Sequence, residues 1–155
     1  MTFKYGRRHW SGMPYPEPLI YPMRQELAVL GAIETRTPAE VDQAIADNET
    51  VLVVVNSVCG CAAGKARPAI GLALKYSNTK PDAVATVFAG ADVEATARVR
   101  ELLSPLPPSS PSMAIFRNGK PVCMIHRHDI EMRQAPEIAK LLVDAFEKHC
   151  AKQSA

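Results

Sequence analysis

Two cysteines separated by one glycine, Cys59-Gly60-Cys61, are the residues of this sequence best suited to covalent chemistry. They follow an apolar, β-branched run at residues 51–55, which predicts a strand buried on both faces. Small and aliphatic residues at helical spacing come next, so the pair is expected where this strand passes into a helix N-terminus. Free backbone N–H groups and the helix dipole stabilise anions there, and a cysteine so placed ionises below the usual pKa of about 8.5. The motif therefore indicates thiol–disulfide chemistry.

Gly60 has a physical role in this interpretation. A disulfide requires Cα atoms about 4.4–6.8 Å apart, so a bridge from Cys59 to Cys61 needs a sharp bend between them. Glycine admits backbone dihedrals that other residues avoid, and such a short bridge is expected to be strained and easily reduced. The charges of Lys65 and Arg67 are expected to lower the Cys59 pKa modestly.

Two other interpretations of the cysteine pair stay open. Free cysteine is commonly a small, inert core residue. A structural zinc site would need two further ligands from the remaining two cysteines and four histidines, and these form no second close pair, since His126 and His128 alternate sides if they lie on a strand. Cys123 is expected to face the core, whereas Cys150, after the last helix, is expected to be exposed and is a candidate accessory thiol.

Composition narrows the class of protein. A chain of 155 residues with 47% hydrophobic content has enough apolar surface for one globular domain. A net charge of +2 does not predict binding to nucleic acid or to a membrane surface. No apolar run approaches the roughly 20 residues of a spanning helix, and no signal peptide is visible. Four cysteines without a secretory signal favour a reducing compartment, so the cytoplasm is the expected location.

The remaining pattern predicts a single α/β domain. We expect an irregular N-terminal arm at residues 1–18, one domain at 19–150 and a C-terminal tail at 151–155. The expected helices cover residues 19–30, 38–46 (opened by the capping box Thr37-Pro38-Ala39-Glu40), 62–76 (kinked at Pro68), 93–103 (with Asp92 as N-cap) and 136–149. The expected strands cover residues 32–36, 51–55, 83–88 and the hairpin 113–116/121–125 around Asn118-Gly119. Strands that alternate with helices before an antiparallel hairpin predict a mixed central sheet with helices on both faces.

This order of elements, with cysteines opening the helix after a central strand, resembles the thioredoxin fold. Pro111 stands just before a strand and eight residues before Gly119, the offset at which thioredoxins carry their active-site cis-proline. The sequence departs from thioredoxin at the motif, which is Cys-Gly-Cys rather than Cys-x-x-Cys and is not preceded by tryptophan.

A closer resemblance is to the bacilliredoxin family, thioredoxin-like proteins of bacteria that use bacillithiol. It is carried by Asn56-Ser-Val-Cys-Gly-Cys-Ala-Ala-Gly64 with Ala66-Arg-Pro68, and it extends over residues 21–150 through shorter stretches at 86–90, 108–112, 127–131 and 145–150. The resemblance implies removal of bacillithiol from S-thiolated proteins, with Cys59 as nucleophile and Cys61 as resolving thiol. It implies no bound cofactor, a low-molecular-weight thiol such as bacillithiol as co-substrate, and S-thiolated cytosolic proteins as partners.

The resemblance also implies a cis peptide at Ser110–Pro111, lying opposite Cys59 and offering backbone groups to the substrate chain. Arg67 and His128 are interpreted as peripheral. Two interpretations stay open for Arg127: a solvated surface arginine, which is preferred, and a residue that steers a carboxylate-bearing small thiol. Two alternative functions remain: a disulfide isomerase or general thioredoxin-like redox protein, and a metallochaperone-like module that binds metal through Cys59 and Cys61.

Overall fold

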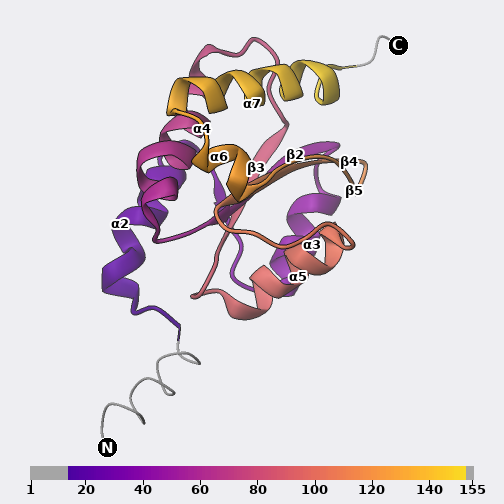
Figure 1. Cartoon of the computed structure of the whole chain (residues 1–155). Coiled ribbons are helices and arrows are strands. Elements are labelled where there is room, and N and C mark those ends of the chain that lie inside the picture. The colour runs from indigo at the N-terminus through magenta and orange to yellow at the C-terminus, as the bar shows by residue number, and fades with distance from the viewer. Residues whose placement is uncertain (1–13, 153–155) are drawn as a thin grey trace, which may run out of the picture.

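The computed structural model describes residues 14–152, and the chain forms a central sheet covered by helices on both faces (Figure 1). Most of the expected N-terminal arm (residues 1–13) and the end of the expected tail (153–155) lie outside the described residues. Within the described range, no helix is long and apolar enough to cross a membrane.

The sheet has five strands in the order β1-β3-β2-β4-β5, which confirms the predicted mixed sheet. Its strands are β1 (Ile33–Glu34), β2 (Thr50–Asn56), β3 (Ala83–Phe88), β4 (Ser112–Arg117) and β5 (Lys120–Ile125). β1, β3 and β2 pair in parallel, and β4 and β5 continue the sheet in antiparallel pairing. Every residue of β2 is buried because this strand lies at the centre of the sheet with helices over both faces.

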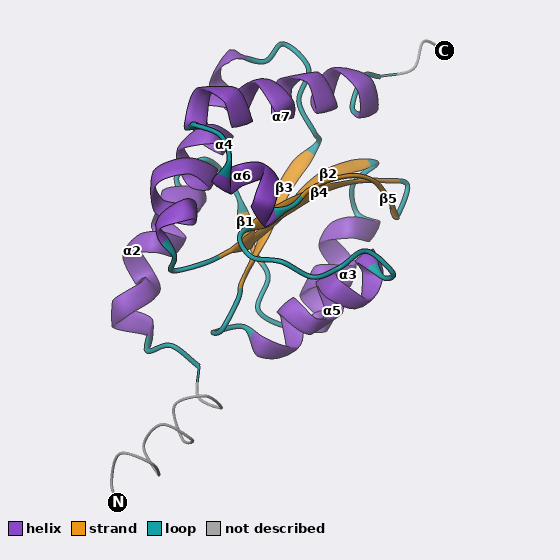
Figure 2. Ribbon diagram, in the orientation of Figure 1, coloured by secondary structure: helices purple, strands orange, loops and turns teal. Residues whose placement is uncertain are grey.

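Helices cover the sheet in two layers, each over its own apolar core (Figure 2). One layer contains α2 (Glu17–Ala28), α4 (Arg67–Tyr76) preceded by the π-helical segment η1 (Ala62–Ala66), α6 (Arg127–Glu131) and α7 (Ala135–His149). The other contains α3 (Pro38–Ala46) and α5 (Val93–Leu103). Because the two cores are separated by the sheet, the cysteine motif at the start of η1 belongs to the α2–α4–α7 layer.

Local sequence signals account for several boundaries. The Thr37 hydroxyl accepts the Glu40 N–H at 3.1 Å, and the Glu40 carboxylate accepts the Thr37 N–H at 3.2 Å, so the predicted capping box is confirmed. Asn118 and Gly119 have φ values of 51° and 81°, as a two-residue type I′ hairpin turn requires.

Helix α2 covers Glu17–Ala28, so it begins and ends two residues earlier than the expected helix at 19–30.

The helix after the cysteines differs from its prediction in one respect. It is continuous to Tyr76, as predicted, but the irregularity precedes Pro68 instead of being a kink at it. Over η1 the helix widens into a π-turn, in which the Arg67 N–H bonds to the Ala62 carbonyl five residues back. The wide turn ends directly before Pro68, which has no N–H to donate to it.

Two further differences concern Asp92 and the short helix α6. Asp92 occupies the N-cap position of α5, but its carboxylate does not cap the helix: it accepts two hydrogen bonds from Arg24 and one from the Phe88 N–H, all at 2.9 Å. Helix α6 was not predicted; its five residues are too few to give a helical pattern in the sequence.

Candidate active site

Cys59 lies at the junction between β2 and the following helix, as predicted. The strand ends at Asn56, and the carbonyl of Cys59 accepts the first helical hydrogen bonds, from the N–H groups of Ala62 at 3.0 Å and Ala63 at 3.1 Å. Both motif cysteines are half-buried thiols. The first thiol is therefore fixed at the helix N-terminus and still partly open to solvent.

Hydrogen bonds to the Cys59 sulfur favour its ionised form. Partial burial by itself raises the pKa of this thiol. The Ser57 hydroxyl, the backbone N–H groups of Ala62 and Cys61, and the positive charge of Arg127 together outweigh burial and hold the pKa of Cys59 below its usual value. Ser57 in turn accepts the Cys59 N–H at 3.2 Å, so its hydroxyl is oriented toward the sulfur. The arrangement therefore favours the thiolate, which is the nucleophilic form of the side chain.

Arg127, which was not predicted to do so, lowers the pKa of Cys59 through its charge. The Lys65 ammonium donates to the Glu131 carbonyl at 2.7 Å, and Arg67 is 4% exposed. The effect predicted for the charges of Lys65 and Arg67 stays a prediction.

With both motif cysteines free, Gly60 lies in the first helical turn, and its φ is outside the left-handed region. The sharp bend predicted for a Cys59–Cys61 bridge stays a prediction. No heavy atom would lie within 4 Å of a Cβ at this position, so the glycine leaves open space beside Cys59. Residues two apart on a helix do not face each other, so a bridge from Cys59 to Cys61 requires this first turn to unwind.

The loop before Cys59 is held by the buried guanidinium of Arg67. Its Nη1 donates to the Asn56 side-chain oxygen at 2.9 Å and to the Ser57 carbonyl at 2.8 Å, and its Nε donates to Glu26 on α2 at 3.1 Å. The Asn56 oxygen also accepts the Ser57 N–H at 2.8 Å. Arg67 is therefore a buried structural residue of the loop before Cys59, and the prediction that it is peripheral to catalysis stays a prediction.

The Ser110–Pro111 peptide is cis, as predicted, and a second cis peptide, at Ser104–Pro105, was not predicted. In the β2–β4 register Val55 pairs with Ser112, which places the Ser110–Pro111 peptide beside the loop that runs from β2 to Cys59. The site therefore has two walls, one from each loop.

Arg127 connects the proline loop to the loop before the thiol, and its side chain is 43% exposed, which agrees with the preferred interpretation of a surface arginine. Its backbone N–H donates to the Ser109 hydroxyl at 3.2 Å, and its Nη1 donates to the Ser110 carbonyl at 3.0 Å. A signal was present in the predicted hairpin: Met113 pairs with Ile125, so residues just after β5 must lie beside residues just before β4. His126 and His128 stack on each other with ring centroids 5.6 Å apart, and His128 is largely exposed.

The other two cysteines lie away from this site. Cys123 is half-buried against the core, as expected, and burial raises its pKa, against a smaller opposite effect of Lys148. The prediction that Cys150 is exposed was wrong: it is 2% exposed because the C-terminal end of α7 packs on the sheet, and burial raises its pKa despite a hydrogen bond with Thr50. Thr50 starts β2 and Cys59 follows its end, roughly 20 Å away along the strand. This placement does not support an accessory role for Cys150.

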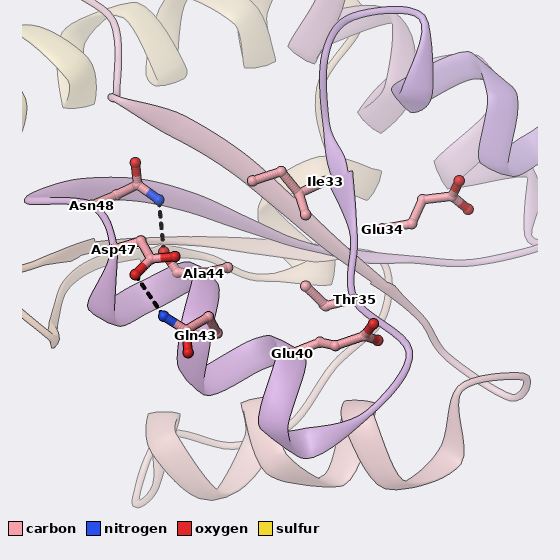
Figure 3. A pocket seen from close by; sticks show the side chains of 8 residues that line it. All are labelled: Ile33, Glu34, Thr35, Glu40, Gln43, Ala44, Asp47 and Asn48. Atoms are coloured by element: carbon pink, nitrogen blue, oxygen red, sulfur yellow. Dashed lines mark hydrogen bonds between the residues drawn. The ribbon is translucent and has the colours of Figure 1, made fainter.

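A separate hollow of about 210 Å³ lies between β1 and α3, on the other face of the sheet (Figure 3). Its polar groups bond to one another or to nearby backbone: Gln43 to Asp47 at 2.6 Å, and Asn48 to the Ala44 carbonyl at 2.8 Å. No cysteine lines it. Among residues 14–152, no three His, Cys, Asp or Glu side chains are grouped as a metal site.

Comparisons with known proteins agree with this geometry. A family model described as "Disulphide isomerase" matches residues 15–150. A bacilliredoxin of Salinibacter ruber is 54% identical over 91% of this chain and 84% of its own length, and one of Bacillus licheniformis is 52% identical over 88% and 95%. Among solved structures, a mutant thioredoxin of Halobacterium salinarum superimposes with a TM-score of 0.54 at 17% identity, covering 79% of this chain and 94% of its own. Fasciola hepatica thioredoxin gives 0.54 at 18% identity, covering 76% and 98%. These two structures establish the thioredoxin-like fold.

Proposed function

This chain belongs to the bacilliredoxin family, and we propose that it removes a small thiol from S-thiolated proteins, with Cys59 as nucleophile and Cys61 as resolving thiol. At a coarser level it is a thiol–disulfide redox protein with a thioredoxin-like fold. Bacillithiol is the co-substrate that we propose from the family, S-thiolated cytosolic proteins are the proposed partners, and the cytoplasm is the proposed location.

The reaction takes place in two exchanges. The Cys59 thiolate attacks the small-thiol sulfur of the mixed disulfide, the original S–S bond breaks, and the protein leaves as a thiolate that takes a proton from water. Cys61 then loses its proton and attacks the Cys59 sulfur, which releases the small thiol as a thiolate and leaves a Cys59–Cys61 disulfide. Alternatively, a second molecule of small thiol attacks the small-thiol sulfur of the adduct, which forms the small-thiol disulfide and releases Cys59 as a thiolate. Each exchange conserves the number of electrons.

One observation supports these roles more than any other: Cys59 is half-buried at a helix N-terminus, and its lowered pKa results from hydrogen bonds that the fold itself supplies. Cys61 lies within the first helical turn. A thiol before the turn can meet an incoming disulfide, and a thiol inside the turn is suited to attack its neighbour once the turn opens.

The test is capture of the intermediate. In Cys61→Ala, mixed with a bacillithiolated protein, an adduct of bacillithiol's mass should accumulate on Cys59, because no other cysteine is placed to remove it. In Cys59→Ala no adduct should form. Intact-mass spectrometry measures both, and Cys123→Ala serves as a control that should behave as the parent protein.

Each remaining outcome selects another function. Capture by Cys59→Ala but not by Cys61→Ala would exchange the two roles. Capture by neither, with stoichiometric metal in protein purified under reducing conditions, would favour the metallochaperone-like alternative. If the chain corrected the disulfide pairing of a substrate with scrambled disulfides but left the S-thiolated protein unchanged, it would be an isomerase. That is the activity in the description of the family model.

A further inference from the structure

The guanidinium of Arg127 is fixed between two elements beside the reactive thiol. Its Nη1 donates to the Ser110 carbonyl at 3.0 Å, and its Nε donates to the Glu131 carboxylate at 3.0 Å, four residues along α6. The backbone N–H of Arg127 holds Ser109 as well, so the residue is anchored to the proline loop at both ends. The Ser110–Pro111 peptide that it contacts lies beside the loop that runs from β2 to Cys59, and its positive charge lowers the pKa of that thiol.

This guanidinium keeps donors available for a ligand. Of its five N–H groups, the two contacts above use one on Nε and one on Nη1, so three remain, including both on Nη2. Within residues 14–152 these three have no hydrogen-bond partner, and the side chain is 43% exposed. A guanidinium with a free planar edge binds a carboxylate through two parallel hydrogen bonds.

The other charged side chains that face this region are engaged. Lys65 of η1 donates to the Glu131 carbonyl at 2.7 Å, and Arg133 donates to the Asp129 carbonyl at 2.9 Å. Glu131 pairs with Arg127 through Nε, and among the described residues Nη2 has no hydrogen-bond partner. Arg127 is therefore the cation that combines a fixed position, remaining donors and proximity to Cys59.

The same contact affects how a protein substrate can bind. The Ser110 carbonyl, a backbone group expected to pair with a substrate chain, already accepts a hydrogen bond from Arg127. An extended peptide would have to share that acceptor, whereas a small anionic thiol gains a partner from the same guanidinium.

We propose that Arg127 is the specificity residue for the small-thiol half of the mixed disulfide, and that it selects thiols bearing a carboxylate. The proposal deepens the proposed function and rests on it.

The test compares three adducts of one protein thiol that differ in charge: 3-mercaptopropionate (anionic), 2-mercaptoethanol (neutral) and cysteamine (cationic). The parent protein should remove the anionic group with the highest kcat/KM and the cationic group with the lowest. In Arg127→Gln the preference for the anionic over the neutral adduct should fall about tenfold, the loss of one charge-assisted contact. Added salt should reduce the preference of the parent protein but not that of the variant.

The ratio of kcat/KM for the anionic adduct to that for the neutral adduct separates an effect on specificity from an effect on thiolate formation. Loss of the Arg127 charge also raises the Cys59 pKa, which slows all three reactions equally and cancels in the ratio. Arg127→Lys keeps the charge without the planar edge and should show an intermediate preference. Arg133→Gln, the matched control on the following turn, should keep the full preference.

Three results would overturn the inference. An unchanged ratio in Arg127→Gln, with all three rates lowered together, would limit Arg127 to supporting the thiolate. Removal of all three groups by the parent protein without a charge preference would refute the inference and leave the proposed function intact. Failure to remove any of the three would refute both.

Discussion

At the scale of single residues, the reactivity of Cys59 depends on a hydroxyl two positions before it. Ser57 accepts the Cys59 N–H through its oxygen and donates its hydrogen to the Cys59 sulfur. Because Ser57 is itself 8% exposed, water competes little for this hydrogen bond. The hydroxyl stabilises the thiolate more than the thiol, which accepts hydrogen bonds poorly.

Ser57→Ala should therefore raise the pKa of Cys59 and slow its alkylation near neutral pH. The measurement is the alkylation rate of Cys59 against pH in a Cys61→Ala background. Ser77→Ala removes a hydroxyl of similar burial at the end of α4 and should leave the profile unchanged. An unchanged profile in Ser57→Ala would mean that backbone N–H groups and Arg127 suffice to lower the pKa.

The lowered Cys59 pKa also predicts how stability changes with pH. The folded pKa lies below the unfolded value of 9.0, so ionisation of Cys59 stabilises the reduced protein fully above that value. This contribution is lost as the pH falls through the folded pKa. The melting temperature of the reduced parent protein minus that of Cys59→Ala should therefore increase from about pH 6 to about pH 10.

Cys123 supplies a control of opposite sign. Burial raises its pKa, so the folded state resists its ionisation and loses stability once the pH exceeds the unfolded value. The corresponding difference between parent and Cys123→Ala should decrease at high pH. Equal slopes for both cysteines would contradict the assignment of the thiolate to Cys59.

At the scale of secondary-structure elements, the junction between β2 and η1 is held by a side chain from beyond the junction. Arg67 donates to the Asn56 side chain and the Ser57 carbonyl, and Asn56 Nδ2 donates to the Met23 carbonyl on α2 at 3.3 Å. One buried polar network therefore joins α2, β2 and α4. This network fixes the position of the backbone directly before Cys59.

Arg67→Ala should lower the free energy of unfolding by about 2–4 kcal/mol, because it leaves two buried acceptors without their donor. Urea unfolding measures the change. Lys140→Ala removes an exposed ion pair with Asp144 on α7 and should have little effect. A loss in Arg67→Ala no larger than in this control would show that water replaces the guanidinium.

Much of the secondary structure was predictable because its causes are local. The buried run of β2, the capping box at Thr37 and the turn at Asn118-Gly119 each depend on residues within a few positions. The π-turn and the short helix α6 were missed, since each covers only five residues and such a short segment gives no periodic pattern in the sequence.

At the scale of the whole molecule, the N-terminal helix α2 is tied to both the site and the sheet. Arg24, 4% exposed, makes two hydrogen bonds to Asp92 at 2.9 Å and lies 5.4 Å from the centre of the Phe88 ring. Burial alone lowers the pKa of Arg24, but Asp92 and Glu17 raise it above its usual value. The helix is thus anchored to the loop between β3 and α5, as well as to the network before Cys59.

Arg24→Met should destabilise the protein by about 3–5 kcal/mol, because it leaves the buried carboxylate of Asp92 without its partner. The double variant Arg24→Met/Asp92→Asn should recover part of this loss, since it removes the unpaired charge. Urea unfolding of the two single variants and the double variant gives the coupling energy. Strictly additive losses would show that the two side chains do not stabilise each other.

The part of the candidate site that was predictable consists of residues that a short sequence motif or the family resemblance marks. Cys59, Cys61 and the cis peptide before Pro111 were identified from motif and resemblance. Ser57 was not recognised as part of the site, although its partner Cys59 is only two residues away. The contacts of Arg67 and Arg127 could not be predicted, because their partners lie 10 or more residues away in the sequence. The burial of Cys150 was missed for the same reason: it depends on how α7 packs on the sheet.

The π-turn at η1 has a consequence for how this chain is aligned with other proteins. A π-turn holds one residue more than an α-turn. The side chains after it therefore point in other directions around the helix axis than they would in a regular α-helix. Removing one residue between Ala62 and Ala66 would restore a regular helix and rotate Arg67 by about 100° relative to Cys61, away from Asn56. An alignment with thioredoxin-fold proteins that lack the wide turn therefore needs a one-residue gap between the cysteine motif and α4. Without that gap, the position matched to Arg67 would belong to a side chain that faces another direction.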